Sequence, residues 1–424
     1  MKKLLAAMLA AASCASVAQA QQEHMPVDAS EAILTLEEAI AEAGGAAPSV
    51  DAANAGIEAA HANRTLAGLR PNPVVQAQIE NVAGTGPYSG LKSAETTMGV
   101  ALPIELGGKR SARVAVADAR LSRAELEAAV VAADVRLQVT ALYVEAIAAQ
   151  RRLATARDQL RIAEDTLRAA RARVQAGRAS PLEEQRADVA RINAAASLER
   201  GARLAEVASL NLARRLGRPI GGAFDVSLLD RLPTATHGPA TAPSAAGTLI
   251  LAAADADLAV ADAGIRLARA NRVPDLNLGP AFRRLEASSD TAAVFTVSIP
   301  IPLFNNGKAG VAQASAERSQ AEARRRMTAL DVEQAIAEAQ AETANAETTA
   351  RTAAGPALAA AQEAARIARI GYREGKFGQL DLLDAERTLA DTRIAAIDAL
   401  ANYQNARARL ERLTVPAPQR GNQQ

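Results

Sequence analysis

Two carboxylates in the C-terminal part of the sequence are the residues whose type and spacing best suit chemistry. Asp381 and Asp384 lie in the stretch GYREGKFGQLDLLDAERTL, residues 371–389. A spacing of three residues places both side chains on one face of a helix. Copies of this pair around a common axis would form a ring that attracts cations and repels anions. Asp381 also has a simpler explanation, because an acid at the third position of a helix stabilises the positive end of the helix dipole.

A related stretch, VQAGRASPLEEQRADVA, occupies residues 174–190 in the first half of the sequence. Glu183 in this stretch aligns with Asp381, whereas Asp384 aligns with a basic residue. Ser180 precedes a proline and stands three residues before Glu183, a spacing that predicts a helix start with a capping box. Each stretch therefore predicts a helix, a tight turn and a second helix. The glycines expected in these turns are Gly177, Gly375 and Gly378.

Patterns that would indicate catalysis or a metal site are lacking in the sequence. His24, His61 and His237 are far apart, and together with the one cysteine, Cys14, they form no set with ligand spacing. The turn GTGPYSG, residues 84–90, is not followed by a helix that could hold a phosphate. No nucleophile and base stand at a catalytic spacing, and a formal charge of +1 gives no argument for nucleic-acid binding. We therefore expect no enzyme, no cofactor, no bound metal and no nucleic-acid partner.

The N-terminal residues 1–20 are typical of a secretory signal peptide. Two lysines precede a short apolar run, and small residues provide a cleavage site after Ala20. Cleavage there would remove Cys14; the alternative is that Cys14 carries a lipid. No later run reaches the roughly 18 apolar residues of a transmembrane helix. The sequence therefore predicts an exported chain without such a helix.

Four short segments alternate between apolar and polar residues, which is the pattern of strands with two different faces. About ten residues is the length that a tilted strand needs to cross a bilayer. The alternative is a soluble two-stranded hairpin in each half of the chain. Four strands are too few to close a barrel, so membrane-crossing strands would have to come from several chains. The segments are residues 74–83, 96–105, 275–286 and 292–302.

Long helical segments fill most of the remaining sequence. Residues 109–176 contain neither Gly nor Pro, and Leu153, Leu160 and Leu167 repeat every seven residues, each followed three residues later by an alanine. This pattern is typical of a coiled-coil seam. Gly355-Pro356 predicts a kink in a later helix. The other long helices are expected at 181–216, 310–374 and 379–414. The chain thus divides into a signal peptide (1–20), a first repeat (21–216), a linker (217–244), a second repeat (245–415) and a disordered tail (416–424).

The repeated order of strand pair, long helix, turn and helix resembles the TolC-like outer membrane efflux proteins. The turn motif GKFGQLDLLDAER, residues 375–387, carries this resemblance most directly. Three further segments, PIELGGKRSARVAVADA, LRPNPVVQAQIENV and NRVPDLNLG, resemble the cobalt–zinc–cadmium resistance branch, the outer membrane factors of heavy-metal RND efflux. The resemblance covers nearly the whole chain after the signal peptide.

The resemblance implies a mainly α-helical fold with a β membrane part. Duplicated helical hairpins would form a trimeric α-barrel in the periplasm, and four strands per chain would contribute to a twelve-stranded outer-membrane β-barrel. The implied partners of this homotrimer are a periplasmic adaptor (membrane fusion) protein, an inner-membrane RND exporter and outer membrane lipid. The expected function is a passive exit duct for exported substrate, above all heavy-metal cations. A multidrug or type I secretion channel is the alternative of the same build, and a soluble periplasmic coiled-coil scaffold is the alternative of another class.

The resemblance also assigns roles to residues at the turns. Two acids would line a pore constriction at the periplasmic end, and a latch would join neighbouring helix pairs. The family's latch has a basic residue two positions after the turn glycine, where this chain has Phe377. Arg373 and Lys376 are the alternative basic residues. The residues concerned are Asp381 and Asp384 for the constriction, and Tyr372 and Glu183 for the latch.

Overall fold

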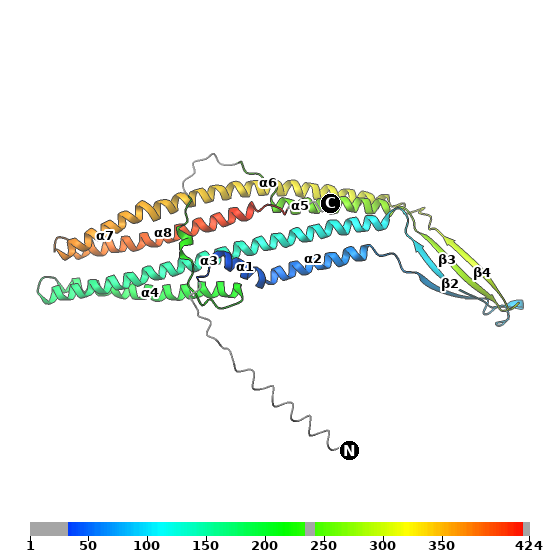
Figure 1. Cartoon of the computed structure of the whole chain (residues 1–424), viewed down its shortest axis with the longest axis horizontal. Helices are drawn as coiled ribbons and strands as arrows, with labels where there is room; N and C mark the ends of the chain where they lie inside the picture. The colour runs from blue at the N-terminus through cyan, green and yellow to red at the C-terminus, as the bar shows by residue number, and fades with distance from the viewer. Residues whose placement is uncertain (1–32, 234–241, 419–424) are drawn as a thin grey trace, which may run out of the picture.

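The computed structural model describes residues 33–233 and 242–418 as an elongated molecule (Figure 1). Its helices and strands are α1 (Leu36–Ala46), α2 (Pro48–Ala67), β1 (Val74–Glu80), β2 (Glu95–Ile104), α3 (Lys109–Gln175), α4 (Pro181–Leu216), α5 (Leu249–Ala270), β3 (Leu276–Leu285), β4 (Asp290–Ser298), α6 (Lys308–Thr352), α7 (Leu358–Arg373) and α8 (Gln379–Leu413). The strands form a sheet at one end, and the turns of hairpins α3–α4 and α7–α8 lie at the other. The expected signal peptide, its cleavage site at Ala20 and the lipidation alternative at Cys14 lie outside the described residues.

The sheet has the antiparallel order β1-β2-β3-β4, so β2 and β3 join the two halves of the chain. One face is apolar and exposed: Met98 pairs with Phe282, which is 69% exposed, and Phe295 on β4 is 65% exposed. The opposite face is polar, and there the Arg283 guanidinium lies 2.8 Å from a Glu95 carboxylate oxygen. A large exposed apolar face marks a surface that contacts lipid or another protein.

Two strands end earlier than the alternation predicts. β1 stops at Glu80 instead of 83, because Asn81 has a φ of 58°, which lies in the left-handed region. β4 stops at Ser298 instead of 302, and prolines at 300 and 302 lack the N–H that a strand ladder needs. β4 also begins two residues earlier than expected, whereas β2 and β3 differ from expectation by one residue at each end.

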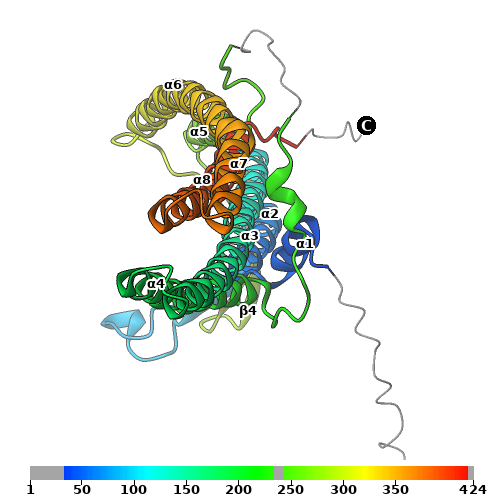
Figure 2. The same cartoon turned by 90° about the vertical axis from the view of Figure 1, so that its left-hand side faces the viewer.

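The main hydrophobic core surrounds the middle of α3, a helix of 67 residues that is roughly 100 Å long. Val139, Tyr143 and Ile147 are fully buried there, and α3 packs against α1, α4 and α8. Many other core residues are alanines, whose small side chains allow close helix packing. An end-on view shows the helices as an arc with α1 on its outer side (Figure 2). None of the described helices is long and apolar enough to cross a membrane.

The second hairpin contains a break that the first hairpin lacks. A π-helical segment, η3 (Ala353–Ala357), separates α6 from α7, and Gly355 in it has the non-helical angles φ −99° and ψ −107°. Pro356 follows Gly355. A proline has no N–H to donate to the helical hydrogen bond, and its ring clashes with the preceding turn of the helix. The predicted kink at Gly355-Pro356 is therefore confirmed, and the range 310–374 is not one continuous helix.

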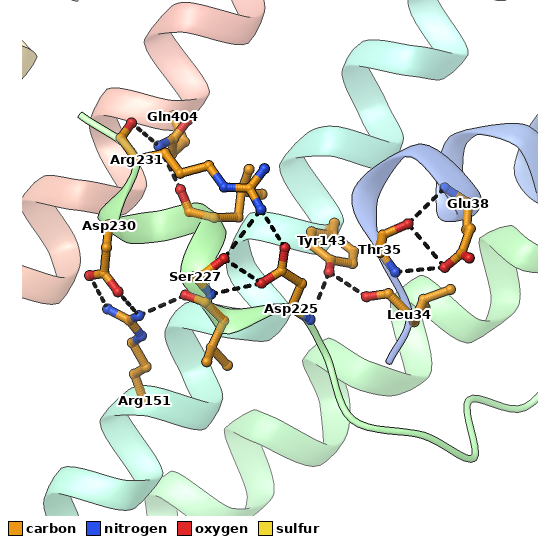
Figure 3. A network of polar contacts seen from close by, with 12 residues as sticks. Leu34, Thr35, Glu38, Tyr143, Arg151, Asp225, Ser227, Asp230, Arg231 and Gln404 are labelled. Carbon is orange, nitrogen blue, oxygen red and sulfur yellow. Dashed lines mark hydrogen bonds and ion pairs between the residues drawn. The ribbon is translucent and has the colours of Figure 1, made fainter. Parts of the chain in front are cut away.

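Part of the expected linker is bound firmly to the helices. Residues 224–231, here called the strap, include the 3-10 segment η2 (Val226–Asp230). The Arg151 guanidinium of α3 donates to Asp230 at 2.8 Å, and the Gln404 amide of α8 donates to the Leu228 carbonyl at 2.9 Å (Figure 3). The strap thereby ties a helix of the first repeat to a helix of the second.

Tyr143 connects the strap to the segment before α1 (Figure 3). Its hydroxyl donates to the Leu34 carbonyl at 2.5 Å and accepts from the Asp225 backbone N–H at 3.1 Å. Its ring meets the Phe224 ring edge-on, with centroids 5.7 Å apart. Burial raises the pKa of the Tyr143 hydroxyl to about 12, against the opposing effect of the Asp225 N–H. This buried contact fixes three separate segments at one level of the molecule.

The end of the chain packs against the second repeat. Pro416 forms a β-bridge with Thr248, and the backbone N–H of Ala417 donates to the Gly247 carbonyl at 2.9 Å. Residues 416–418 therefore do not belong to the disordered tail that was expected from 416 onward; residues 419–424 lie outside the described part.

Candidate pore constriction at the hairpin turns

Both long hairpins turn in the same way. Gly177 and Gly375 adopt left-handed φ angles of 69° and 72°, which favour glycine. The next residue in each turn, Arg178 or Lys376, donates its backbone N–H to the carbonyl five residues earlier, at 2.9 and 2.8 Å. This is the Schellman arrangement that satisfies the last carbonyls of a helix. The duplicated sequence stretches thus form duplicated turns.

Phe377 packs in the second turn, where the family pattern has a basic residue. Its ring lies so close to Gly371 that a Cβ added there would be 2.1 Å from the Phe377 Cδ2 atom. Gly371 is therefore required by the contact with the ring. The two alternative basic residues are both exposed, and Arg373 donates its Nε to the Arg369 carbonyl at 3.4 Å.

Asp381 and Asp384 are both exposed at the start of α8. Asp381 is the third residue of the helix, and its carboxylate accepts a hydrogen bond from the Gly378 backbone N–H at 3.0 Å. This bond closes the helix start, so Asp381 has a structural role. Asp384 lies one turn further along, and its carboxylate makes no hydrogen bond or ion pair with any residue in 33–233 or 242–418. The Asp384 carboxylate is therefore available to ions.

Glu183 does not form the capping box expected from Ser180. The Ser180 hydroxyl instead accepts from the Leu182 backbone N–H at 3.3 Å, and the Glu183 N–H donates to the Ser180 carbonyl. The proline at the first position of α4 leaves no N–H there to satisfy. The Glu183 Oε2 atom is buried without a hydrogen-bond partner among the described residues.

Tyr372 is buried where the two hairpins meet. It is 6% exposed and packs against Leu382, while the Arg173 guanidinium of α3 lies 4.8 Å from the centre of its ring. A cation at this distance is attracted by the face of the ring. The Tyr372 hydroxyl has no hydrogen-bond partner in the described chain, so Tyr372 and Glu183 are not bonded to one another. Arg173 thus supplies the basic group that the turn itself lacks beside this tyrosine.

Two polar contacts near the turns were not predicted from the sequence. Gln379, the first residue of α8, is 4% exposed and donates its Nε2 to the Glu183 backbone carbonyl at 2.7 Å. Arg369 on α7 binds the buried Glu386 on α8, with Nη2 2.7 Å from Oε2, and this hydrogen bond raises the pKa of Arg369. The second contact joins the two helices of one hairpin, so the antiparallel pairing expected of α7 and α8 was a usable signal for it. The first depends on how two distant hairpins pack.

The described residues contain no group of three or more His, Cys, Asp or Glu side chains that could hold a metal ion. A cavity of about 340 Å³ beside Tyr372 is lined by oppositely charged side chains, among them Asp165, Arg369 and Glu386. Arg369 and Glu386 already neutralise each other there. The turns therefore combine exposed carboxylates with buried contacts between helices.

Residues 39–218 and 246–414 match the family described as outer membrane efflux protein, and each matched segment holds one long hairpin. The chain belongs to the outer membrane efflux protein family. This efflux protein is therefore a channel of the outer membrane with a helical extension in the periplasm, and it is not an enzyme. Family membership confirms the predicted fold class of long helices with four antiparallel strands, and it excludes the alternative of a soluble scaffold.

Relatives and solved structures agree with this assignment. The efflux protein is 28% identical over 387 residues to the cobalt-zinc-cadmium resistance protein CzcC of Cupriavidus metallidurans, covering 90% of each chain. It is 28% identical over 283 residues to the nickel-cobalt-cadmium resistance protein NccC of Alcaligenes xylosoxydans xylosoxydans, covering 66% of this chain and 63% of that one. The open state of the Neisseria gonorrhoeae outer membrane channel MtrE matches with a TM-score of 0.73 at 22% identity, over 90% of this chain and 89% of that one. The last likeness shows the fold.

Proposed function

We propose that this efflux protein is the passive exit duct of a tripartite RND-type system that removes heavy-metal cations. Its partners would be a periplasmic adaptor protein and an inner-membrane RND exporter, which supplies the energy. The observation that carries the proposal is the exposed acidic pair, Asp381 and Asp384, at the end of the molecule opposite the apolar sheet. The resistance to cobalt, zinc, cadmium and nickel named in two relatives supports cations as the cargo.

The proposal includes assembly as a homotrimer. In the described part of the chain, the sheet has four strands, and its outer strands, β1 and β4, each have one unpaired edge. Unpaired backbone groups are costly in lipid, so the sheet has to close with other copies. Three copies would supply twelve strands, which is enough for a barrel with an open lumen. The polar face with Arg283 would line that lumen, and the apolar face with Phe282 would meet lipid.

The acidic pair would form the constriction of this duct. In a trimer, Asp381 and Asp384 would contribute six carboxylates around one axis, and such a ring favours cations over anions. Tyr372 and Glu183, both at the contact between the hairpins, would belong to the latch that keeps the constriction closed. A duct must release what it passes, so weak attraction by exposed carboxylates suits transport better than a tight metal site.

Planar-bilayer recording of the purified protein tests the constriction. The variant Asp381→Ala/Asp384→Ala should change the conductance and should lose roughly a factor of two or more in its cation-to-anion permeability ratio, because the ring charge is removed. Asp384→Asn alone should also lower the ratio, because it removes one charge per chain from the ring. It leaves the helix start intact, since the bond there is made by Asp381.

The matched control is Asp391→Ala. Asp391 is an exposed acid on the same helix, but it lies further from the turn and pairs with Arg387. It should behave as the wild type. Unchanged conductance and unchanged ion preference in the Asp381→Ala/Asp384→Ala protein would contradict a constriction at this turn.

A further inference from the structure

Gln379 makes the hydrogen bond that joins the turn of the second hairpin to that of the first. It is the first residue of α8, and its Nε2 donates to the backbone carbonyl of Glu183 in the first turn of α4, at 2.7 Å. α3 packs against both α4 and α8, so the Gln379 side chain connects two helices that already share α3 as a neighbour. The side chain is 4% exposed, although it stands in a turn whose other polar residues face solvent.

We propose that Gln379 is the positioning residue that holds the α7–α8 turn, with its acidic pair, against the α3–α4 turn, and that this arrangement is the closed state of the constriction. The inference rests on the proposed constriction and adds the group that keeps it shut. Asp381 follows Gln379 by two residues and Asp384 by five, on the same rigid helix. Movement of the start of α8 away from the Glu183 carbonyl would therefore carry both carboxylates with it.

The other residues expected to form a latch do not make this connection. Phe377 is occupied by its packing on Gly371. The Tyr372 hydroxyl has no acceptor among the described residues, and its ring interacts with Arg173 through a contact that carries no directed hydrogen bond. Gln379 is thus the side chain through which a helix of the second hairpin donates directly to the α4 turn.

The contact is also of a kind that can open. Three buried polar atoms at this junction lack hydrogen bonds within the described chain: Gln379 Oε1, Glu183 Oε2 and the Tyr372 hydroxyl. A buried polar atom without a partner is destabilising, and separation of the turns would return all three to water. The closed junction therefore has one strong directed bond and several groups that gain from opening, which suits a gate that a partner protein has to release.

Single-channel recording of position 379 variants tests this role. Gln379→Met keeps the size of the side chain but removes the donor, so the ratio of open to closed time should rise about fivefold or more. Gln379→Lys retains an N–H donor and brings a positive charge to the unpaired Glu183 carboxylate, so it should keep the channel closed. A side chain that merely filled space would give the opposite order, with Met tolerated and Lys disruptive.

Gln185→Met is the matched control, because Gln185 is an exposed glutamine of the α4 start. It should record as wild type, and all variants should be compared at equal amounts of assembled protein. Wild-type gating in Gln379→Met, together with altered conductance in Asp381→Ala/Asp384→Ala, would overturn the role of Gln379 and leave the constriction in place. Unchanged recordings from both variants would overturn both.

Discussion

At the residue scale, the two aspartates at the start of α8 differ in their structural roles. Asp381 accepts from the Gly378 N–H, so its removal both discharges the turn and loosens the start of the helix. Asp384 has no such bond within the described chain. Neutralisation of Asp384 should therefore change the charge of the proposed constriction without loosening the helix start. For this reason the single Asp384→Asn variant is more informative than the double replacement.

Tyr143 offers a stability prediction away from the turns. Tyr143→Phe leaves the Leu34 carbonyl and the Asp225 N–H without their shared partner in a buried site. We expect a loss of about 1–3 kcal/mol in the free energy of unfolding near neutral pH. The loss should be measured by denaturant unfolding, with Tyr88→Phe, an exposed tyrosine, as the control that changes little.

The same hydroxyl gives a pH dependence whose sign follows from its raised pKa. The folded protein keeps Tyr143 protonated up to about pH 12, whereas the unfolded chain loses the proton near the ordinary value of 10. Its contribution to stability is therefore complete below pH 10 and falls as the pH rises to about 12, by about 2–3 kcal/mol. Tyr143→Phe lacks this loss, so the stability gap between the two proteins should narrow over that range. A gap that stays constant from pH 9 to 12 would contradict the buried, neutral tyrosine.

Residues that act within one turn could be predicted from the sequence, and residues that act between turns could not. Gly177 and Gly375 predicted the two turns correctly, because a backbone position with a left-handed φ favours glycine. Gln379 carried no such signal, because its partner lies in another hairpin and the register between hairpins is set by packing along α3. The capping box assigned to Ser180 and Glu183 was wrong, because the Ser180 hydroxyl accepts from the Leu182 N–H and the Glu183 N–H donates to the Ser180 carbonyl instead.

At the scale of elements, β4 provides a matched pair of neighbours on opposite faces of the sheet. Phe295 lies on the apolar face and Thr296 on the polar face, and both are exposed in the single chain. Phe295→Arg should place a charge in lipid at a cost of about 2–4 kcal/mol near the middle of the bilayer. We expect much less heat-resistant oligomer in the outer membrane fraction of cells that produce this variant.

Thr296→Arg is the control in the same strand. It should assemble normally and change the conductance, because its side chain would face the lumen. Equal assembly of the two variants would contradict the assignment of the faces. The alternation of apolar and polar residues predicted these faces, but the ends of the strands depended on a positive φ at Asn81 and on prolines beyond Ser298.

The helical elements show where duplication stops. α3 runs unbroken through the level of the strap, whereas its counterpart is split by η3. The Gly355-Pro356 pair predicted this break from the sequence, because a proline inside a helix removes a hydrogen bond and clashes with the preceding turn. The fixed position of the strap could not be predicted from the sequence. A stretch rich in Gly and Pro predicts a linker, yet Arg151 and Gln404 bind the strap to both repeats. Its order comes from partners that are distant in the sequence.

At the scale of the whole molecule, the apolar sheet and the acidic turns lie at opposite ends of a helix about 100 Å long. The helices therefore place the acidic turns far from the sheet, at the periplasmic end of the molecule. In the proposed system, the energy for export would come from the RND exporter. The chain itself would contribute a route and a constriction that selects by charge.

If the proposed constriction selects by charge, a prediction about cargo follows that can be measured in cells. Deletion of the gene should lower tolerance to zinc, cobalt and cadmium several-fold, and the wild-type gene should restore it. Asp384→Asn should restore it incompletely, because divalent cations are attracted to a carboxylate ring in proportion to its charge. Asp391→Ala should restore it fully. Unchanged metal tolerance combined with new sensitivity to organic drugs would instead identify a multidrug outlet, in which the same ring would still exclude anions but the metal cations would not be its cargo.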